Sequence, residues 1–279
     1  MKIIASVQGM QKITSDLHKK SKTIGFIPTM GALHKGHLKL ISESKKNNDI
    51  TVVSIFVNPA QFSPTEDLAR YPRPLEHDKK LLEQEKVDYL FHPNVKTMYP
   101  NGFQTYVTPN NLSNILEGKS RPGHFAGVAT IVLKLFNLVN PTNAYFGQKD
   151  FQQCIVIKQM VRDLNLPVKI NIVPTVRDKD GLALSSRNVF LSSQERLQAL
   201  SLYQSLLLGK KLILAGNKNV KKIKAEMNNY LQKYKLIRLD YIEICNIEDL
   251  SIVKVASKKA VILITAFVGK TRLIDNIII

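Results

Sequence analysis

Two histidines stand three positions apart in the stretch FIPTMGALHKGHLKLI, residues 26–41, where an apolar run gives way to a new apolar periodicity. His34 and His37 fall on one side of a first helical turn, because side chains at i and i+3 are neighbours on a helix. Two imidazoles placed there can donate hydrogen bonds to phosphate oxygens and to the charge that develops on them. Gly31 and Gly36 let the backbone approach a ligand closely. The pattern therefore predicts an anion-binding turn between a strand and a helix.

Two other interpretations of this histidine pair stay open. The rings could be a structural pair, each satisfied by its neighbours, or two ligands of a metal ion. Zinc sites take at least three protein ligands, and no third ligand at a suitable spacing is evident in the sequence. In the anion-binding interpretation, the helix that begins near Gly36 is expected to present unpaired backbone N–H groups, whose partial positive charge favours an anion.

Two further clusters carry groups that suit phosphates. The stretch FGQKDFQQ, residues 146–153, places Lys149 and Asp150 at the start of an expected helix. A lysine ammonium suits phosphate oxygens, whereas the aspartate could bind a ribose hydroxyl or simply cap the helix. The stretch GLALSSRN, residues 181–188, offers hydroxyls, N–H groups and a guanidinium to a polyphosphate, and a plain N-cap or turn is the alternative.

The elements that position these clusters alternate along the first part of the chain. Apolar runs predict strands at 23–28, 50–57, 87–91, 143–146 and 168–176, and periodic segments predict helices at about 35–47, 74–85, 124–139 and 151–164. This alternation predicts an α/β fold with a Rossmann-like, doubly wound parallel sheet. Ligands of such sheets bind beyond the carboxyl ends of the strands, and the turn that holds the two histidines is such a place.

The pattern changes after Val176, where a polar, turn-rich segment precedes helices and then strands. Helices are expected at about 193–214 and 217–235, and strands near 238–245, 259–268 and 271–278. Helices followed by strands indicate an α+β arrangement. The sequence thus predicts a larger domain, 1–176, and a smaller C-terminal α+β domain, 177–279.

Composition limits the class of protein. The chain has 279 residues, is 44% hydrophobic and carries a net charge of +18, which fits a globular chain of one or two domains. Its lysines are scattered rather than gathered in an arm, so nucleic acid is not the expected partner. No apolar run approaches the ~18 residues of a membrane span, and the first residues lack a signal-peptide pattern. Cys154 and Cys245 form no C-x-x-C pair, so we expect reduced cysteines in a cytoplasmic protein.

In order along nearly the whole chain, several stretches together resemble the pantoate–β-alanine ligase (pantothenate synthetase) family. They are PTMGALHKGH (28–37), VNPAQF (57–62), YPR (71–73), LEGKSRPGHFAGV (116–128), KLFNLVNP (134–141), FGQKDFQQ (146–153), TVRDKDGLALSSRN (175–188) and TRLIDN (271–276). The H-x-G-H element is also the signature of the wider nucleotidyltransferase group, which includes class I aminoacyl-tRNA synthetases.

The resemblance implies a reaction and its participants. Family members are cytoplasmic homodimers that use ATP and Mg²⁺, with small-molecule substrates and neither nucleic acid nor membrane as partners. Pantoate's carboxylate attacks the α-phosphorus of ATP to form pantoyl adenylate, and β-alanine's amine then displaces AMP to give pantothenate. The smaller C-terminal domain is expected to act as a lid over the site.

The resemblance also assigns roles to particular residues. Those implied as catalytic are His37, His34 and Lys149. Those implied in ATP binding are Met30, Gly31, Ala32, Leu33, His34, Lys35, Gly36, His37, Gly147, Gln148, Lys149, Asp150, Val176, Leu184, Ser185, Ser186 and Arg187. Those implied in pantoate or β-alanine binding are Gln61 and Gln153. No metal ligand is assigned. The chain departs from the family at Gln148, usually acidic, and at Pro74, more often a small hydroxyl residue.

Two alternative functions remain open, one based on the H-x-G-H motif and one on the net charge. The shared H-x-G-H would also suit a different nucleotidyltransferase, one that transfers AMP or CMP to a phosphorylated acceptor and so needs an extra cationic pocket. The charge of +18 would suit a synthetase-related module that binds RNA, whose affinity would fall steeply with salt.

Overall fold

A computed structural model of the chain describes residues 1–63 and 68–279. They form two compact units, the first made of Met1–Gln148 and Gln152–Pro174, the second of Lys149–Phe151 and Thr175–Ile279. The division expected at residue 176 lies close to the start of the segment Thr175–Ile279. The sequence did not predict that the short stretch Lys149–Phe151 belongs with the C-terminal segment.

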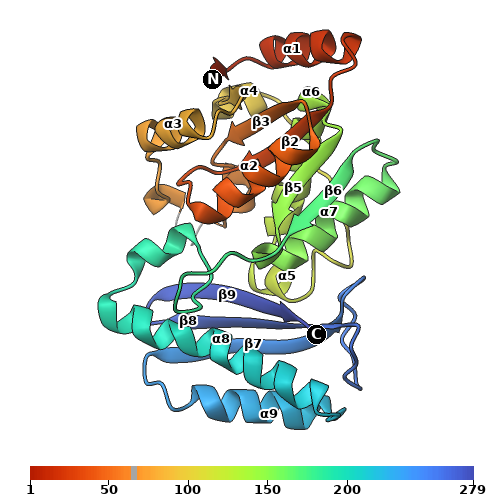
Figure 1. Cartoon of the computed structure of the whole chain (residues 1–279). Helices are drawn as coiled ribbons and strands as arrows, with labels where there is room; N and C mark the ends of the chain where they lie inside the picture. The colour runs from red at the N-terminus through yellow and green to blue at the C-terminus, as the bar shows by residue number, and fades with distance from the viewer. Residues whose placement is uncertain (64–67) are drawn as a thin grey trace. The chain divides into compact units, whose positions relative to one another are not determined.

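The first unit contains a six-stranded, fully parallel sheet (Figure 1). Its strands are β1 (Lys2–Ile4), β2 (Ile24–Thr29), β3 (Ile50–Ile55), β4 (Tyr89–Phe91), β5 (Asn143–Gly147) and β6 (Lys169–Val173), in the order β1-β4-β3-β2-β5-β6. The chain builds outward from β2 through β3 to β4, and then crosses back to β5 on the other side of β2. The carboxyl ends of β2 and β5 therefore flank the switch point at which open α/β sheets bind ligands.

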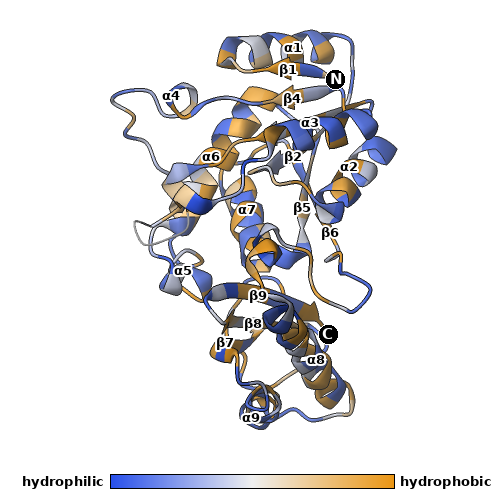
Figure 2. Cartoon of the chain, turned by 90° about the vertical axis from the view of Figure 1, so that its left-hand side faces the viewer, coloured by the Kyte–Doolittle hydropathy of each residue, from blue (hydrophilic) through white to orange (hydrophobic). Residues whose placement is uncertain are grey.

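Helices cover both faces of this sheet, as Figure 2 shows for α2 and α6. The helices of the first unit are α1 (Val7–Lys19), α2 (Lys35–Asn47), α3 (Leu75–Gln84), α4 (Val95–Met98), α5 (Glu117–Ser120), α6 (His124–Val139) and, from Gln152 on, α7 (Phe151–Asp163). Neighbouring strand residues point to opposite faces: Ile27 belongs to the core cluster that includes residues of α2 and α3, whereas the Phe26 ring packs edge-on against Phe136 of α6. This two-sided burial explains why β2 and β3 are continuous apolar runs.

The second unit is a three-stranded antiparallel sheet packed against two helices. Its elements are α8 (Ser193–Leu214), α9 (Val220–Leu231), β7 (Ile237–Asn246), β8 (Ala260–Val268) and β9 (Thr271–Ile278), with β8 in the middle of the sheet. Ser192 and Glu195 form a capping box that begins α8. The side chain of Asn219 caps α9, which is why this helix begins later than the expected residue 217.

The predicted fold class is confirmed: a Rossmann-like doubly wound parallel sheet is joined to a smaller α+β unit. The strand expected at 168–176 ends at Val173, because Pro174 has no N–H to continue the ladder. The strand β1 and the helix α1 were not predicted. Among the described residues, no helix has both the length and the apolar character needed to cross a membrane.

Candidate active site

The turn between β2 and α2 holds both histidines in a fixed arrangement. The Gly36 N–H donates to Nδ1 of His34 at 3.1 Å, and the His34 N–H donates to Nδ1 of His37 at 3.3 Å. The ring centroids lie 4.2 Å apart. Because each Nδ1 accepts a hydrogen bond, a neutral ring must carry its proton on Nε2. Both imidazoles are therefore set as Nε2–H donors.

The same contacts change the expectation about backbone donors. The N–H groups of Gly36 and His37 are already used, on the His34 side chain and on the His34 carbonyl oxygen at 2.8 Å. These two N–H groups are therefore not left for an anion. A Cβ atom on Gly36 would lie 2.8 Å from Cε1 of His34, so the histidine cap itself requires a glycine there.

A buried carboxylate from α3 holds the start of the turn. Oδ2 and Oδ1 of Asp78 accept from the N–H groups of Ala32 and Leu33, each at 2.8 Å. Gly31 and Ala32 both have positive φ, +82° and +50°, and such a conformation makes successive N–H groups converge on an anion. Burial raises the pKa of Asp78, although the two N–H donors oppose that shift. An internal carboxylate thus occupies the anion-binding concavity of the turn, and nothing in the sequence signalled this residue.

Gln61 ends the short 3₁₀ helix η1 (Pro59–Gln61) that follows β3, and its side chain is buried. Its Oε1 accepts from Nδ2 of Asn58 at 3.0 Å, and its Nε2 lies 3.1 Å from the sulfur of Met30. Tyr99 donates its hydroxyl to Oδ1 of Asn58 at 2.8 Å, and burial raises the pKa of Tyr99, which keeps this hydroxyl a donor. The structure therefore brings the predicted residues Gln61 and Met30 together and fixes the direction of the amide.

The helix α6 fixes the backbone of Gln61. His124 donates from Nδ1 to the Gln61 carbonyl oxygen at 2.8 Å, and its Nε2 lies 3.0 Å from Nη1 of Arg121, which donates to it. A Cβ atom on Gly127 would lie 2.2 Å from the carbonyl oxygen of Ala60. The stretch RPGHFAGV thus matters as a support for Gln61, a role that the sequence analysis did not assign to it.

The two glutamines at the start of α7 differ in what their amides do. The buried Gln152 donates to the carbonyl oxygens of Leu112 and Ile115, at 2.8 and 2.9 Å, and accepts from the Glu117 N–H at 3.0 Å. The side chain of Gln153 is half-buried and makes no hydrogen bond within residues 1–63 and 68–279. Of the pair, only the predicted ligand Gln153 keeps hydrogen-bonding groups for a ligand.

The predicted residues of the second unit lie on two segments that meet. The Nζ of Lys149 lies 3.5 Å from Oδ1 of Asp150. Ser185 accepts from the Arg187 N–H at 3.2 Å and caps the 3₁₀ helix Ser186–Phe190, as the capping alternative predicted. Lys149 and Ser185 also line one small void of about 10 Å³, so the structure brings these two segments together.

The other predicted positions are structurally simple. Gly147 ends β5, and a Cβ atom there would meet nothing within 4 Å, so this glycine is not required by its own neighbours. Gln148 is half-buried. The N–H of Leu184 donates to the carbonyl oxygen of Val176 at 3.0 Å, which closes the turn between them.

A cavity of about 580 Å³ lies beyond the carboxyl ends of β2, β3 and β4, lined mostly by apolar side chains. Met30, Gly31 and Asp78 contribute to its wall. The histidines and glutamines predicted as ligands are not among the described residues that line it. Nor do the described residues contain a group of three or more His, Cys, Asp and Glu side chains that could hold a metal ion.

A parallel sheet with paired imidazole donors beyond β2, next to the switch point, defines the class: an α/β protein of the Rossmann type, with a site suited to anionic, nucleotide-like ligands. The sequence model of the family described as pantoate–β-alanine ligase matches residues 2–278. The chain therefore belongs to the pantoate–β-alanine ligase family, and it is a ligase that joins pantoate to β-alanine.

Individual relatives agree with this family. The chain is 53% identical over 279 residues to a pantothenate synthetase of Thermotoga petrophila, covering 100% of both chains. The crystal structure of pantothenate synthetase from Thermus thermophilus is similar with a TM-score of 0.93 at 43% identity, covering 99% of each chain. That of pantoate–β-alanine ligase from Francisella tularensis, complexed with β-γ ATP and β-alanine, is similar with a TM-score of 0.81 at 39% identity, covering 100% of this chain and 97% of the other.

Proposed function

We propose that the protein drives the condensation of pantoate and β-alanine with ATP in two steps, through pantoyl adenylate. The observation that carries this proposal is the H-x-G-H turn, where hydrogen bonds to both Nδ1 atoms fix His34 and His37 as Nε2–H donors beside the switch point. The Francisella tularensis ligase, solved with an ATP compound and β-alanine, supports the choice of nucleotide and amine.

In the first step, a carboxylate oxygen of pantoate attacks the α-phosphorus of ATP. A new P–O bond forms, the bond to the β-phosphate oxygen breaks, and pyrophosphate leaves with its electron pair. Such transfers depend mainly on positioning and on stabilising charge at the phosphoryl oxygens. His34, His37 and Lys149 are proposed to supply that stabilisation.

Pantoate is proposed to bind between the amides of Gln61 and Gln153. Because Oε1 of Gln61 already accepts from Asn58, Gln61 offers a ligand its Nε2–H. Gln153 keeps both amide groups. Neutral amides can hold pantoate's oxygens without pairing its carboxylate with a full positive charge, which leaves that carboxylate nucleophilic.

In the second step, the amine of β-alanine attacks the acyl carbon of pantoyl adenylate. An amide bond forms, the bond from the acyl carbon to the bridging oxygen breaks, and AMP leaves with that oxygen. The amine loses a proton to the medium. The products of the two steps together are pantothenate, AMP and pyrophosphate.

Further segments are proposed to contribute to ATP binding. Gly147 and Asp150 would contact the ribose, Val176 the adenine, and Leu184–Arg187 the phosphates. The open space around Gly147 supports a close approach of the nucleotide there. The proposed Mg²⁺ ion would bind together with ATP, because Mg²⁺ is usually held through substrate phosphates plus few protein groups. It would neutralise phosphate charge. The homodimer, the cytoplasmic location, the lid role of the second unit and the absence of nucleic-acid partners stay predictions.

The direct test follows AMP release by the purified protein with Mg²⁺–ATP, pantoate and β-alanine, leaving out one substrate at a time. The proposal predicts AMP only when all three are present, together with pantoate-dependent exchange between ATP and pyrophosphate in the absence of β-alanine. Exchange that does not depend on pantoate would overturn the assigned acid, and a stable nucleotidylated product with no amine requirement would favour a different nucleotidyltransferase.

The proposed donors make a quantitative prediction. His37→Ala and Lys149→Ala should each slow pantoate-dependent exchange by ~100-fold or more, the usual loss when a transition-state donor is removed. His18→Ala and Lys158→Ala serve as matched controls: both residues lie outside the proposed site, His18 near the end of α1 and the exposed Lys158 in α7. Near-normal exchange rates in both site variants would contradict the assignment of His37 and Lys149 as donors.

A further inference from the structure

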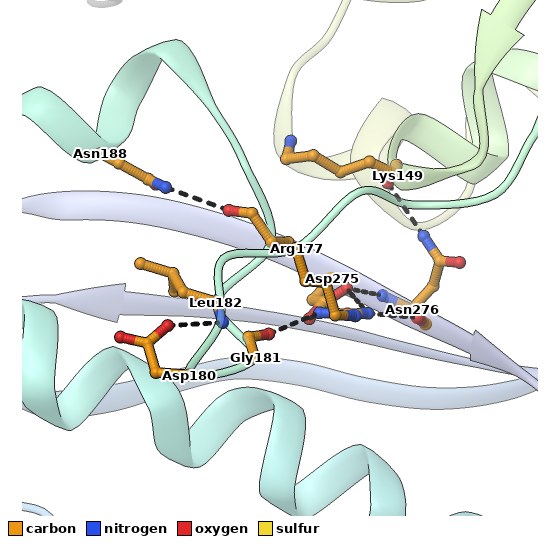
Figure 3. Close-up of polar contacts among 9 residues, drawn as sticks. Lys149, Arg177, Asp180, Gly181, Leu182, Asn188, Asp275 and Asn276 are labelled. Atoms are coloured by element: carbon orange, nitrogen blue, oxygen red, sulfur yellow. Dashed lines mark hydrogen bonds and ion pairs between the residues drawn. The ribbon is translucent and has the colours of Figure 1, made fainter. Parts of the chain in front are cut away.

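Two neighbouring residues of β9, Asp275 and Asn276, lie in the TRLIDN stretch that shares the family pattern but has no role in the proposed reaction. Both are buried, at 5% and 2% exposure. Figure 3 shows that they contact the two segments of the second unit that carry predicted ligands. Burying a polar group costs free energy unless its hydrogen bonds are made. The hydrogen bonds of Asp275 and Asn276 therefore show which parts of the unit they hold.

Asn276 holds the main chain of Lys149. Its Nδ2 donates to the Lys149 carbonyl oxygen at 2.9 Å (Figure 3). Its own backbone N–H donates to Oδ1 of Asp275 at 2.8 Å, which ties the two β9 residues to each other. The position from which the Lys149 side chain extends is therefore fixed by a strand more than a hundred residues later in the sequence.

Asp275 holds the other segment through Arg177. Its carboxylate pairs in bidentate fashion with the guanidinium, Oδ2 to Nη1 at 2.6 Å and Oδ1 to Nη2 at 2.8 Å. Nη1 also donates to the Gly181 carbonyl oxygen at 3.2 Å, and the guanidinium carbon lies 3.7 Å from the centroid of the Tyr203 ring. Bidentate pairs add geometric specificity as well as energy, so Arg177 is held in one orientation.

Further contacts connect Arg177 to the loop Leu184–Arg187. Arg177 and Ala183 form an antiparallel bridge, and Nδ2 of Asn188 donates to the Ala183 carbonyl oxygen at 3.0 Å. Asp275, Lys149 and Ser185 line the same void of about 10 Å³, which leaves room for little more than a water molecule. Lys149, Ser185 and Asp275 thus border one small space.

We infer that Asp275 and Asn276 are positioning residues for adenylate formation, which set Lys149 and the loop Leu184–Arg187 in register with each other. The inference rests on the proposed function, because it acts through the phosphate-binding roles assigned to these two segments. Neither β9 residue needs to touch a substrate. Misplacing a catalytic group by about 1 Å can cost a hundredfold in rate, so the loss of either contact should be measurable.

The test compares Asn276→Ala and Asp275→Asn with the wild-type protein in pantoate-dependent ATP–pyrophosphate exchange. We expect kcat/KM for ATP to fall at least about tenfold in both, while the KM for pantoate stays near its wild-type value because its amide ligands are untouched. Asp240→Asn is the matched control, because it breaks another arginine–aspartate pair of the same sheet, Arg272 with Asp240 at 2.8 Å, and should leave the kinetics for ATP unchanged.

A second measurement separates positioning from general stability. Asn276→Ala is combined with Lys149→Ala, and the affinity for ATP is measured by calorimetry in all four combinations. If Asn276 acts through Lys149, its effect should shrink when the lysine is already absent, since coupled residues are not additive. An unchanged effect in the Lys149→Ala background would overturn the inference for Asn276. If Asn276→Ala does not fold, Asn276→Asp, which keeps the volume but loses the donor, carries the same test.

The outcomes distinguish this inference from the proposed function. A wild-type protein without pantoate-dependent exchange would overturn the proposed function and the inference with it. Two outcomes would overturn the inference alone. In one, folded Asn276 and Asp275 variants keep the exchange rate of the wild-type protein. In the other, their exchange rate falls only in proportion to the folded fraction, with both KM values unchanged.

Discussion

Each ring of the H-x-G-H turn has one nitrogen committed to the backbone, and the proposed phosphate contacts use the other nitrogen. A hydrogen bond to Nδ1 of His34 and another to Nδ1 of His37 hold both rings in the tautomer that donates from Nε2. Protonation of either Nδ1 would turn an acceptor into a donor and break its contact. The structural and functional interpretations of the pair are therefore compatible, because the capping nitrogen and the donating nitrogen are different atoms.

The first residue-scale prediction concerns Asp78. In Asp78→Asn, the amide oxygen can accept from only one of the N–H groups of Ala32 and Leu33, and the amide nitrogen faces the other as a second donor. Because a buried N–H is then left unpaired, we expect a loosened turn and exchange about tenfold slower. Exchange kinetics and thermal melting measure this. Asp88→Asn, which alters a carboxylate that accepts from the Thr51 N–H at 2.8 Å elsewhere in the sheet, is the control, and unchanged exchange in folded Asp78→Asn would contradict the assignment.

The two adjacent glutamines of α7 give the second prediction. Gln153→Ala should raise the KM for pantoate by about tenfold, the cost of one good hydrogen bond, and leave the melting temperature unchanged. Gln152→Ala should instead lower the free energy of unfolding by about 2 kcal/mol or more, because it strands buried backbone groups that its amide now satisfies. Steady-state kinetics and urea unfolding of the pair check this, and a stability loss confined to Gln153→Ala would contradict it.

Residue types and local spacing were enough to single out candidate residues for the proposed reaction. His34, His37, Lys149 and Ser185 stand in short motifs next to one another in the sequence. The glutamines Gln61 and Gln153 came only from the family resemblance. The supporting residues could not be found in this way, because Asp78 contacts Ala32 across 46 positions and Asn276 contacts Lys149 across 127, and such separations leave no local pattern.

Between elements, the fit of α6 against η1 depends on a glycine. Helix propensity alone predicts that Gly127→Ala would stabilise the protein by about 1 kcal/mol. A Cβ atom would however lie 2.2 Å from the carbonyl oxygen of Ala60, so the helix or the turn that ends in Gln61 must shift. We expect a lower melting temperature and a higher KM for pantoate, and a variant more stable than the wild type would show that the contact is not limiting.

The strands and helices that were predicted correctly are those whose period is set by burial. The strands β2 and β3 are mostly apolar because helices cover both faces. The helix α2 buries Leu40 and Ile41 on its inner side, and α6 is buried along most of its length. The helix α1 was missed although Ser6 caps it, Met10 and Thr14 are buried on one side, and Val7, Met10, Ile13 and Leu17 recur at helical spacing. The strand β1 has only Lys2–Ile4, which is too short for a periodic pattern.

At the scale of the whole molecule, the residues proposed to bind ligands belong to two units, and each unit is stabilised by its own core. The core of the second unit joins α8, α9 and the three-stranded sheet, and the same sheet supplies the residues that hold Lys149. The net charge of +18 suits a protein whose proposed substrates, ATP and pantoate, are both anions, since a positive field raises their local concentration. The charge alone therefore does not require nucleic acid as a partner.

The measurement that tests the central claim most directly follows the oxygen atoms of pantoate. Pantoate labelled with ¹⁸O in its carboxylate is turned over with ATP, Mg²⁺ and β-alanine, and the products are analysed by mass spectrometry. If the carboxylate attacks the α-phosphorus and AMP later leaves with the bridging oxygen, each AMP should carry one labelled oxygen and pyrophosphate none. Unlabelled AMP, with the label in inorganic phosphate or pyrophosphate, would contradict the adenylate and the account built on it.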